Sequence, residues 1–200
     1  MKLKNNFLYL LIPLMILFSC SESDSSAGDQ LYNNKQYEEA IAAYSGVLIN
    51  DPKNVKALYS RGRSHEELGN LDEAEKDFKS ALTVDSKNVQ VLMSLSNLYQ
   101  KKKDNEMALQ YANYATEVPG APAMAYFLKG RAYHLLGNTQ KALTEYNTAL
   151  KMDDEFSQAY YYRGMLKLAT DQKREACADF NLAIALDNPD AKSAASEYCQ

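Results

Sequence analysis

The sequence predicts an all-α solenoid of five 34-residue helix-turn-helix repeats, followed by a C-terminal capping helix. Three observations carry this prediction: a period of 34 residues, a helical spacing of small and aromatic side chains within each period, and helix-breaking residues between periods. The period runs from the first repeat to the fifth without an insertion or deletion. One alanine marks the same position in every repeat: Ala40, Ala74, Ala108, Ala142 and Ala176.

Residues 1–19 are predicted to be a signal peptide. Lys2 and Lys4 precede an almost unbroken apolar run over residues 7–18. This run is shorter than the roughly 20 apolar residues of a membrane-spanning helix, but it has the length of an export signal. Pro13 in its middle also disfavours a permanent transmembrane helix.

The apolar run ends in Leu17-Phe18-Ser19-Cys20, which resembles the lipobox of bacterial lipoproteins. The resemblance implies that Cys20 is acylated and becomes the first mature residue, with residues 20–27 forming a short polar tether. It also implies a bacterial cell-envelope protein with a lipid anchor in the membrane, and Ser21 after the cysteine is similar to lipoproteins sent to the outer membrane. The alternative is a plain secretory signal, in which Cys20 is an ordinary thiol.

Each repeat is predicted to contain two helices. In the second helix, positions four and seven residues after the marker alanine carry a ring or a small residue, which places them on one helical face. In the first helix a glycine or serine recurs, and this indicates a close approach of two backbones. These three series are Tyr44, Phe78, Ala112, Tyr146 and Phe180; Val47, Ala81, Ala115, Ala149 and Ala183; and Gly28, Gly62, Ser96, Gly130 and Gly164.

Turn residues set the predicted boundaries. Leu68-Gly69-Asn70 and Leu136-Gly137-Asn138 end first helices, because glycine readily adopts the left-handed conformation. Proline and aspartate stand between repeats. The predicted repeats are 28–52, 53–86, 87–120, 121–154 and 155–189, and residues 191–200 form a capping helix against the last repeat.

These in-phase series resemble the tetratricopeptide repeat (TPR) family over about residues 27–190. The resemblance implies a right-handed superhelix in which the first helices line a concave groove for an extended peptide or a partner's helix. The third repeat departs from the family pattern, because Ser96 replaces glycine and Ala112 replaces the ring.

The predicted groove follows from equivalent positions in the first helices. Rings and a thioether recur one step from the glycine face, and hydrogen-bonding side chains follow four residues later on the same face. Tyrosine and arginine are frequent at binding hot spots. The predicted partner-binding residues are Tyr59, Arg63, Met93, Asn97, Phe127, Arg131 and Tyr161. The alternative is that these rings only pack against neighbouring helices.

Chaperone-binding TPR proteins hold a terminal carboxylate with lysines and asparagines at set positions. Here those positions carry Tyr59, Arg63, Ser94, Met124 and Leu128, so chaperone-tail capture is not expected.

Other chemistry finds little support in the sequence. His65 and His134 are the two histidines, and neither has recurring carboxylates or cysteines at ligand spacing, so no metal site, cofactor or enzyme activity is predicted. Removing Lys2 and Lys4 leaves 20 basic and 26 acidic residues, a charge of about −6, which disfavours nucleic acid as a partner.

Cys177 and Cys199 form a possible disulfide in an oxidising compartment, with two free thiols as the alternative.

The predicted function is therefore a non-enzymatic adaptor or scaffold, anchored to the membrane through Cys20, that binds a protein or peptide partner in an envelope assembly. A second interpretation is a glycan or small-molecule binder that uses the groove rings as stacking platforms. An enzyme is the third and least supported interpretation.

Overall fold

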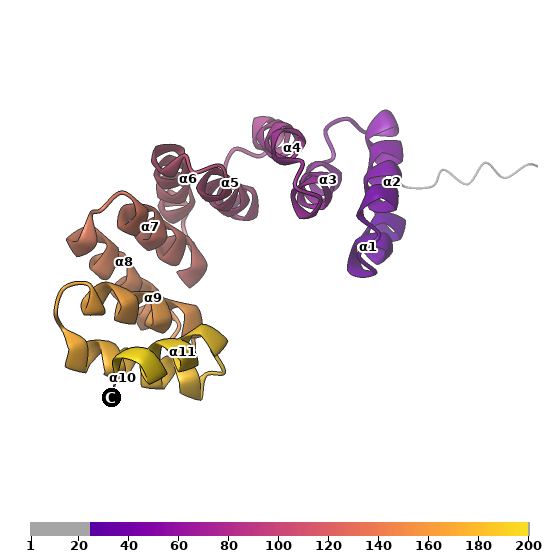
Figure 1. Cartoon of the computed structure of the whole chain (residues 1–200). Coiled ribbons are helices and arrows are strands. Elements are labelled where there is room, and N and C mark those ends of the chain that lie inside the picture. Colours follow the sequence, from indigo (N-terminus) through magenta and orange to yellow (C-terminus); the bar gives the residue numbers. More distant parts are fainter. Residues whose placement is uncertain (1–24, 200) are drawn as a thin grey trace, which may run out of the picture.

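The computed structural model describes residues 25–199 and confirms the all-α repeat fold (Figure 1). This part of the chain forms 11 α-helices and no strand. The predicted signal segment and Cys20 lie outside the described residues. The helices are α1 (Ser26–Asn33), α2 (Tyr37–Asn50), α3 (Val55–Glu67), α4 (Leu71–Val84), α5 (Val89–Lys101), α6 (Asn105–Glu117), α7 (Ala123–Leu135), α8 (Thr139–Met152), α9 (Ser157–Leu168), α10 (Lys173–Ala185) and α11 (Pro189–Tyr198).

Consecutive helices pair into five hairpins that stack side by side. The pairs follow an arc with α1 and α2 at one end and α11 at the other (Figure 1). In the second to fifth hairpins the two helices of the hairpin share the largest interfaces, whereas α2 contacts α3 more than it contacts the short α1. Further contacts join α4 to α5, α6 to α7 and α8 to α9. Each hairpin therefore packs on its neighbours, as expected of a solenoid.

The recurring glycine of the first helix lies against the ring of the second helix. A Cβ atom built on Gly62 would be 2.7 Å from the Phe78 ring, and one on Gly130 would be 2.7 Å from the Tyr146 ring. Gly28 with Tyr44 and Gly164 with Phe180 form the same contact. Any side chain at these positions would displace a buried ring, which explains why glycine recurs despite its low helix propensity.

The turn inside every hairpin uses one residue in the left-handed conformation. Glycine supplies it at Gly69 (φ 78°) and Gly137 (φ 76°). Lys35 (φ 60°), Lys103 (φ 62°) and Asp171 (φ 60°) adopt the same conformation at the equivalent positions. The following amide then bonds a carbonyl of the preceding helix, as in Asp104 N to Tyr99 O at 2.9 Å. The turn geometry is thus shared by all five hairpins, although only two of them have glycine.

Asparagine caps start the first helices of the second and third repeats. Asn54 and Asn88 accept hydrogen bonds from the backbone amides of Ala57 and Val91, at 2.9 and 3.2 Å. Their own amide groups donate to the aspartates three residues earlier, at 3.1 Å in both cases. The side chains satisfy backbone donors that a helix start leaves unpaired.

A cation and a carboxylate 16 residues apart form a further recurring contact. The guanidinium of Arg61 makes two bonds of 2.7 Å to Asp77 and a third, of 3.0 Å, to Ser45 of the preceding repeat. Arg163 repeats this arrangement with Asp179 and Asn147, and Lys129 pairs with Glu145 at 3.1 Å. The two arginines thus join three helices across the boundary between repeats, whereas the Lys129 pair joins the two helices of one hairpin.

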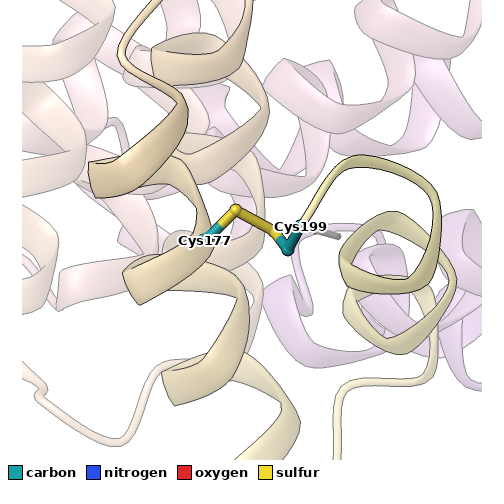
Figure 2. The surroundings of a disulfide bond; sticks show 2 residues. All are labelled: Cys177 and Cys199. Atoms are coloured by element: carbon teal, nitrogen blue, oxygen red, sulfur yellow. A yellow bond between two sulfur atoms is a disulfide. The ribbon is translucent and has the colours of Figure 1, made fainter.

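The C-terminal helix α11 caps the last repeat and starts at Pro189, two residues before its predicted start. The side chain of Asn188 accepts a hydrogen bond from Ala191 N at 3.0 Å. A disulfide joins Cys177 of α10 to Cys199, which directly follows α11 (Figure 2). Between residues 25 and 199, every helix is too short or too polar to span a bilayer.

Candidate protein-binding groove

Three adjoining clefts run along the first helices of the repeats. Tyr59 and Arg63 line both the first and the second cleft, and Asn97 lines both the second and the third. The clefts therefore form one continuous surface over α1, α3, α5 and α7, which we call the inner groove. Its lining residues include Asp29, Tyr32, Tyr59, Arg63, Glu66, Glu67, Gln90, Met93, Ser94, Asn97, Gln100, Lys101, Met124, Leu128, Arg131 and Leu135.

Four of the seven predicted groove residues meet in the central cleft. Tyr59 and Arg63 come from α3, and Met93 and Asn97 come from α5. All four are partly exposed. They combine a phenol ring and a thioether with guanidinium and amide donors, a mixture suited to apolar side chains and to the polar backbone of an extended peptide.

Arg131 lies in the third cleft beside Asn97. Its guanidinium carbon is 5.0 Å from the centre of the Tyr162 ring and 5.9 Å from that of Phe127. Within residues 25–199 no carboxylate lies within salt-bridge distance of Arg131. The groove therefore presents one cation that rests on aromatic rings and is not neutralised by an ion pair.

The prediction that Phe127 lines the groove is wrong, because its side chain is only 2% exposed. Its ring packs against Phe156 and Tyr162 of the next repeat, with centroids 4.8 and 5.6 Å away. Two repeats earlier, Asn88 and Ser94 occupy the positions of Phe156 and Tyr162, and these small side chains leave Tyr59 partly open. The size of the following repeat's residues decides whether the ring is covered.

Tyr161 also lies apart from the three clefts. Its ring is 6.2 Å from Phe180 and 5.2 Å from Tyr162, and it packs in a cluster with Tyr198 of α11. The capping helix thus covers part of the Tyr161 surface that the prediction assigned to a partner.

A connected set of polar groups lies where the first cleft meets the second. Arg63 lies 5.0 Å from the centre of the Tyr32 ring and 3.9 Å from a carboxylate oxygen of Glu67, which accepts a 3.2 Å hydrogen bond from the Tyr32 hydroxyl. Burial, assisted by the Glu67 carboxylate, raises the pKa of Tyr32 to about 12. Tyr32 therefore stays protonated and remains a hydrogen-bond donor at neutral pH.

Several groove residues were missed by the sequence interpretation. Glu67, Lys101 and Leu135 are spaced by 34 residues, four positions after Arg63, Asn97 and Arg131, and all three line the clefts. This third row was detectable from the same spacing. Glu66 was harder to find, since its role depends on a 2.7 Å ion pair with Lys101 of the next repeat.

The two histidines lie in different surroundings. Burial and the nearby Arg131 guanidinium both lower the pKa of His134, so its imidazole is neutral at pH 7. The Nδ1 atom of His65 is buried without a hydrogen-bond partner. Among the described residues no three histidine, cysteine, aspartate or glutamate side chains are grouped to hold a metal ion.

Comparison with known proteins identifies the class of repeat. Tetratricopeptide repeat models match residues 26–89 and residues 123–156. The chain therefore contains tetratricopeptide repeats, and the all-α solenoid is the fold that these repeats build.

Sequence relatives are similar only over short segments. A segment of 47 residues, 24% of this chain, is 47% identical to the peptidyl-prolyl cis-trans isomerase FKBP42 of Arabidopsis thaliana. The aligned segment is 13% of that relative, so the chain spans a small part of its length.

Solved structures resemble most of the chain. PilW, described as a widely conserved type IV pilus biogenesis factor, has a TM-score of 0.75 and 20% identity, with 81% of this chain and 75% of PilW covered. YrrB, described as a TPR protein with an unusual peptide-binding site, has a TM-score of 0.68 and 21% identity, with 88% and 94% covered. At these identities the likeness establishes the shared fold.

The positions that chaperone-binding TPR proteins use to hold a terminal carboxylate all line the central cleft; here they carry Tyr59, Arg63, Ser94, Met124 and Leu128. They carry one cation, two apolar side chains, a phenol and a hydroxyl. The set lacks the lysines and asparagines that the chaperone-binding members use.

Proposed function

We propose that this protein is a membrane-anchored TPR adaptor that binds an extended segment of a partner protein in the inner groove. The observation that carries the proposal is the central cleft, where Tyr59, Arg63, Met93 and Asn97 converge from two adjacent repeats. A single peptide could contact both repeats there, and its binding would be sensitive to their relative position.

The residues of the groove define the kind of segment that fits. Met93, Met124 and the Tyr59 ring offer apolar surface, and methionine adapts to side chains of different shape. Gln90 and Asn97 offer amide groups to a peptide backbone. Arg131, which has no carboxylate partner in the described chain, suits an acidic side chain or a terminal carboxylate. We therefore infer a peptide with apolar residues followed by a carboxylate.

The fold relatives support an interaction role. One is described as a pilus biogenesis factor and another by its peptide-binding site. We extend from these descriptions only the use of a TPR surface to hold a protein segment in an assembly. The concave groove of this chain is the surface that supports that use.

The anchoring part of the proposal rests on the Leu17-Phe18-Ser19-Cys20 motif. Acylation at Cys20 would fix the chain to a bacterial envelope membrane, and we place it at the outer membrane. The first helix starts at Ser26. Six residues reach at most about 20 Å when extended, so the repeats would stay close to the lipid surface.

Co-purification from native envelopes tests the groove. Arg63→Ala and Asn97→Ala together should reduce the yield of one specific protein by about tenfold or more, since both lie in the central cleft. Lys76→Ala on the exposed side of α4 is the matched control and should leave the yield unchanged. An equal yield from all three proteins would contradict the proposal. Loss of the captured partner after complete glycosidase treatment would favour the glycan interpretation instead.

A further inference from the structure

A large apolar side chain is exposed where the first repeat meets the second. Ile49, in the last turn of α2, is 80% exposed, the highest value among the large hydrophobic residues of the described chain. Pro52 follows it in the loop between α2 and α3, and both line a shallow cleft with Leu48 and Leu58. Exposure of this extent leaves nearly the whole isoleucine side chain in contact with solvent.

Ile49 lies at the same end of the first hairpin as the start of α1. Helices α1 and α2 form an antiparallel hairpin, so the end of α2 lies beside the start of α1. A 2.7 Å ion pair between Asp29 and Lys56 also joins the first turn of α1 to the first turn of α3. The segment from Ile49 to Lys53 is thus at the end of the hairpin where the described part of the chain begins.

The charges along the edge that contains these loops change from one end of the solenoid to the other. Near Ile49 the exposed Lys53 is balanced by Asp51 in the same loop, and in the next loop Asp85 and Lys87 lie near Val84, which is 43% exposed. The corresponding loop between α8 and α9 carries Asp153, Asp154 and Glu155. The near-neutral, apolar loop at Ile49 is therefore compatible with a lipid surface, whereas an anionic surface repels the acidic loop.

We propose that the segment formed by Ile49, Pro52 and Lys53 is a second membrane contact that orients the solenoid on the lipid surface. This inference rests on the proposed acylation of Cys20. A tether of about 20 Å holds the segment at high effective concentration near the bilayer, so a weak interfacial contact is sufficient. Ile49 inserts among the headgroups and Lys53 lies beside lipid phosphates.

Fluorescence quenching in reconstituted membranes tests the contact. The full chain, produced in a bacterium that acylates lipoproteins, carries an environment-sensitive fluorophore on Ile49→Cys, with Lys53→Cys as a second labelling site. Leu135→Cys and Met152→Cys are controls, because these residues are also half exposed, at 53% and 50%. The vesicles contain phosphatidylethanolamine, phosphatidylglycerol and a lipid with a shallow nitroxide quencher.

The expected result is a blue-shifted emission and at least about twofold stronger quenching at residues 49 and 53 than at residues 135 and 152. Equal quenching at all four sites on an acylated, vesicle-bound protein would overturn the second contact and leave the anchor intact. If mass spectrometry finds no acyl group on Cys20 and the protein does not float with vesicles, both the anchor and this contact are overturned. Circular dichroism of each labelled variant checks that the helices are retained.

Discussion

The hydroxyl of Ser96 donates a 2.9 Å hydrogen bond to the backbone carbonyl oxygen of Ala108, deep inside the third repeat. Both residues are fully buried, as is Ala112. In the other repeats the position of Ser96 is glycine and the position of Ala112 is a ring, and the two are in contact. In the third repeat the first-helix position therefore carries a larger side chain than glycine, and the facing second-helix position carries a smaller one than a ring. The added hydroxyl is hydrogen-bonded within the same hairpin.

This exchange predicts strong coupling between residues 96 and 112. Ala112→Phe alone should destabilise the protein by about 1–3 kcal/mol, because the ring would collide with the Ser96 side chain. Ser96→Gly alone should cost about 1–2 kcal/mol through the lost hydrogen bond and lower helix propensity. The double variant rebuilds the glycine–ring contact and should be more stable than the sum of the two changes by at least about 1 kcal/mol. Urea unfolding of the four proteins measures the coupling, and strictly additive effects would contradict this account.

The left-handed turns predict that glycine stabilises hairpins that lack it. Lys103→Gly should raise the free energy of unfolding by about 0.5–1 kcal/mol, since Lys103 has φ 62° and its side chain opposes that conformation. Gly137→Lys, at the equivalent turn with φ 76°, should lower it by a similar amount. Thermal unfolding of both variants provides the comparison. A decrease for Lys103→Gly would show that the lysine contributes more than its backbone conformation costs.

These turns show where sequence reasoning succeeds and where it fails. The 34-residue spacing predicted the repeat solenoid, because buried small residues and rings must recur wherever hairpins stack in the same way. It located glycine turns only at Gly69 and Gly137, since Lys103 and Asp171 adopt the same conformation without a residue type that signals it. Phe127 was assigned to the groove for a related reason. Its exposure depends on the size of Phe156 and Tyr162 in the next repeat, and the 34-residue spacing alone does not show that these rings cover it.

The bidentate contact between Arg61 and Asp77 predicts that lysine cannot replace arginine. Asp77 is 4% exposed and receives two 2.7 Å bonds from one guanidinium. Arg61→Lys should cost about 1–2 kcal/mol by removing the second bond and the contact with Ser45. Asp77→Ala should cost about 2–4 kcal/mol, because it leaves a partly buried cation unpaired. Urea denaturation curves compare the loss of stability in the two variants. A lysine variant as stable as the natural protein would contradict a role of the Arg61 guanidinium in joining α2, α3 and α4.

The Glu75 carboxylate predicts a loss of stability in acid. Burial raises its pKa, but hydrogen bonds from Lys102, Lys79 and Tyr99 outweigh burial and lower the pKa to about 2. Because its ordinary value is 4.5, the unfolded chain takes up the proton first as the pH falls. The stabilisation is therefore complete above about pH 4.5 and is lost as the pH falls toward 2. Glu75→Gln should flatten this part of the stability profile, measured by urea unfolding between these pH values.

Glu73→Gln is the matched control for this experiment. Glu73 lies in the same helix two residues earlier and is exposed. Its substitution should leave the acid-induced decline unchanged. A decline of the same size in all three proteins would show that Glu75 is not the group whose protonation weakens the fold.

The central claim is that the inner groove holds a partner protein, and photocrosslinking in native envelopes tests it most directly. A photoreactive residue at Met93, which lines the central cleft, is compared with one at Lys76 on the exposed side of α4. We expect one defined protein to be captured from Met93, and this adduct to disappear when Arg63→Ala and Asn97→Ala are introduced. Capture of the same proteins in equal amounts from Met93 and Lys76, unaffected by the groove substitutions, would contradict the account.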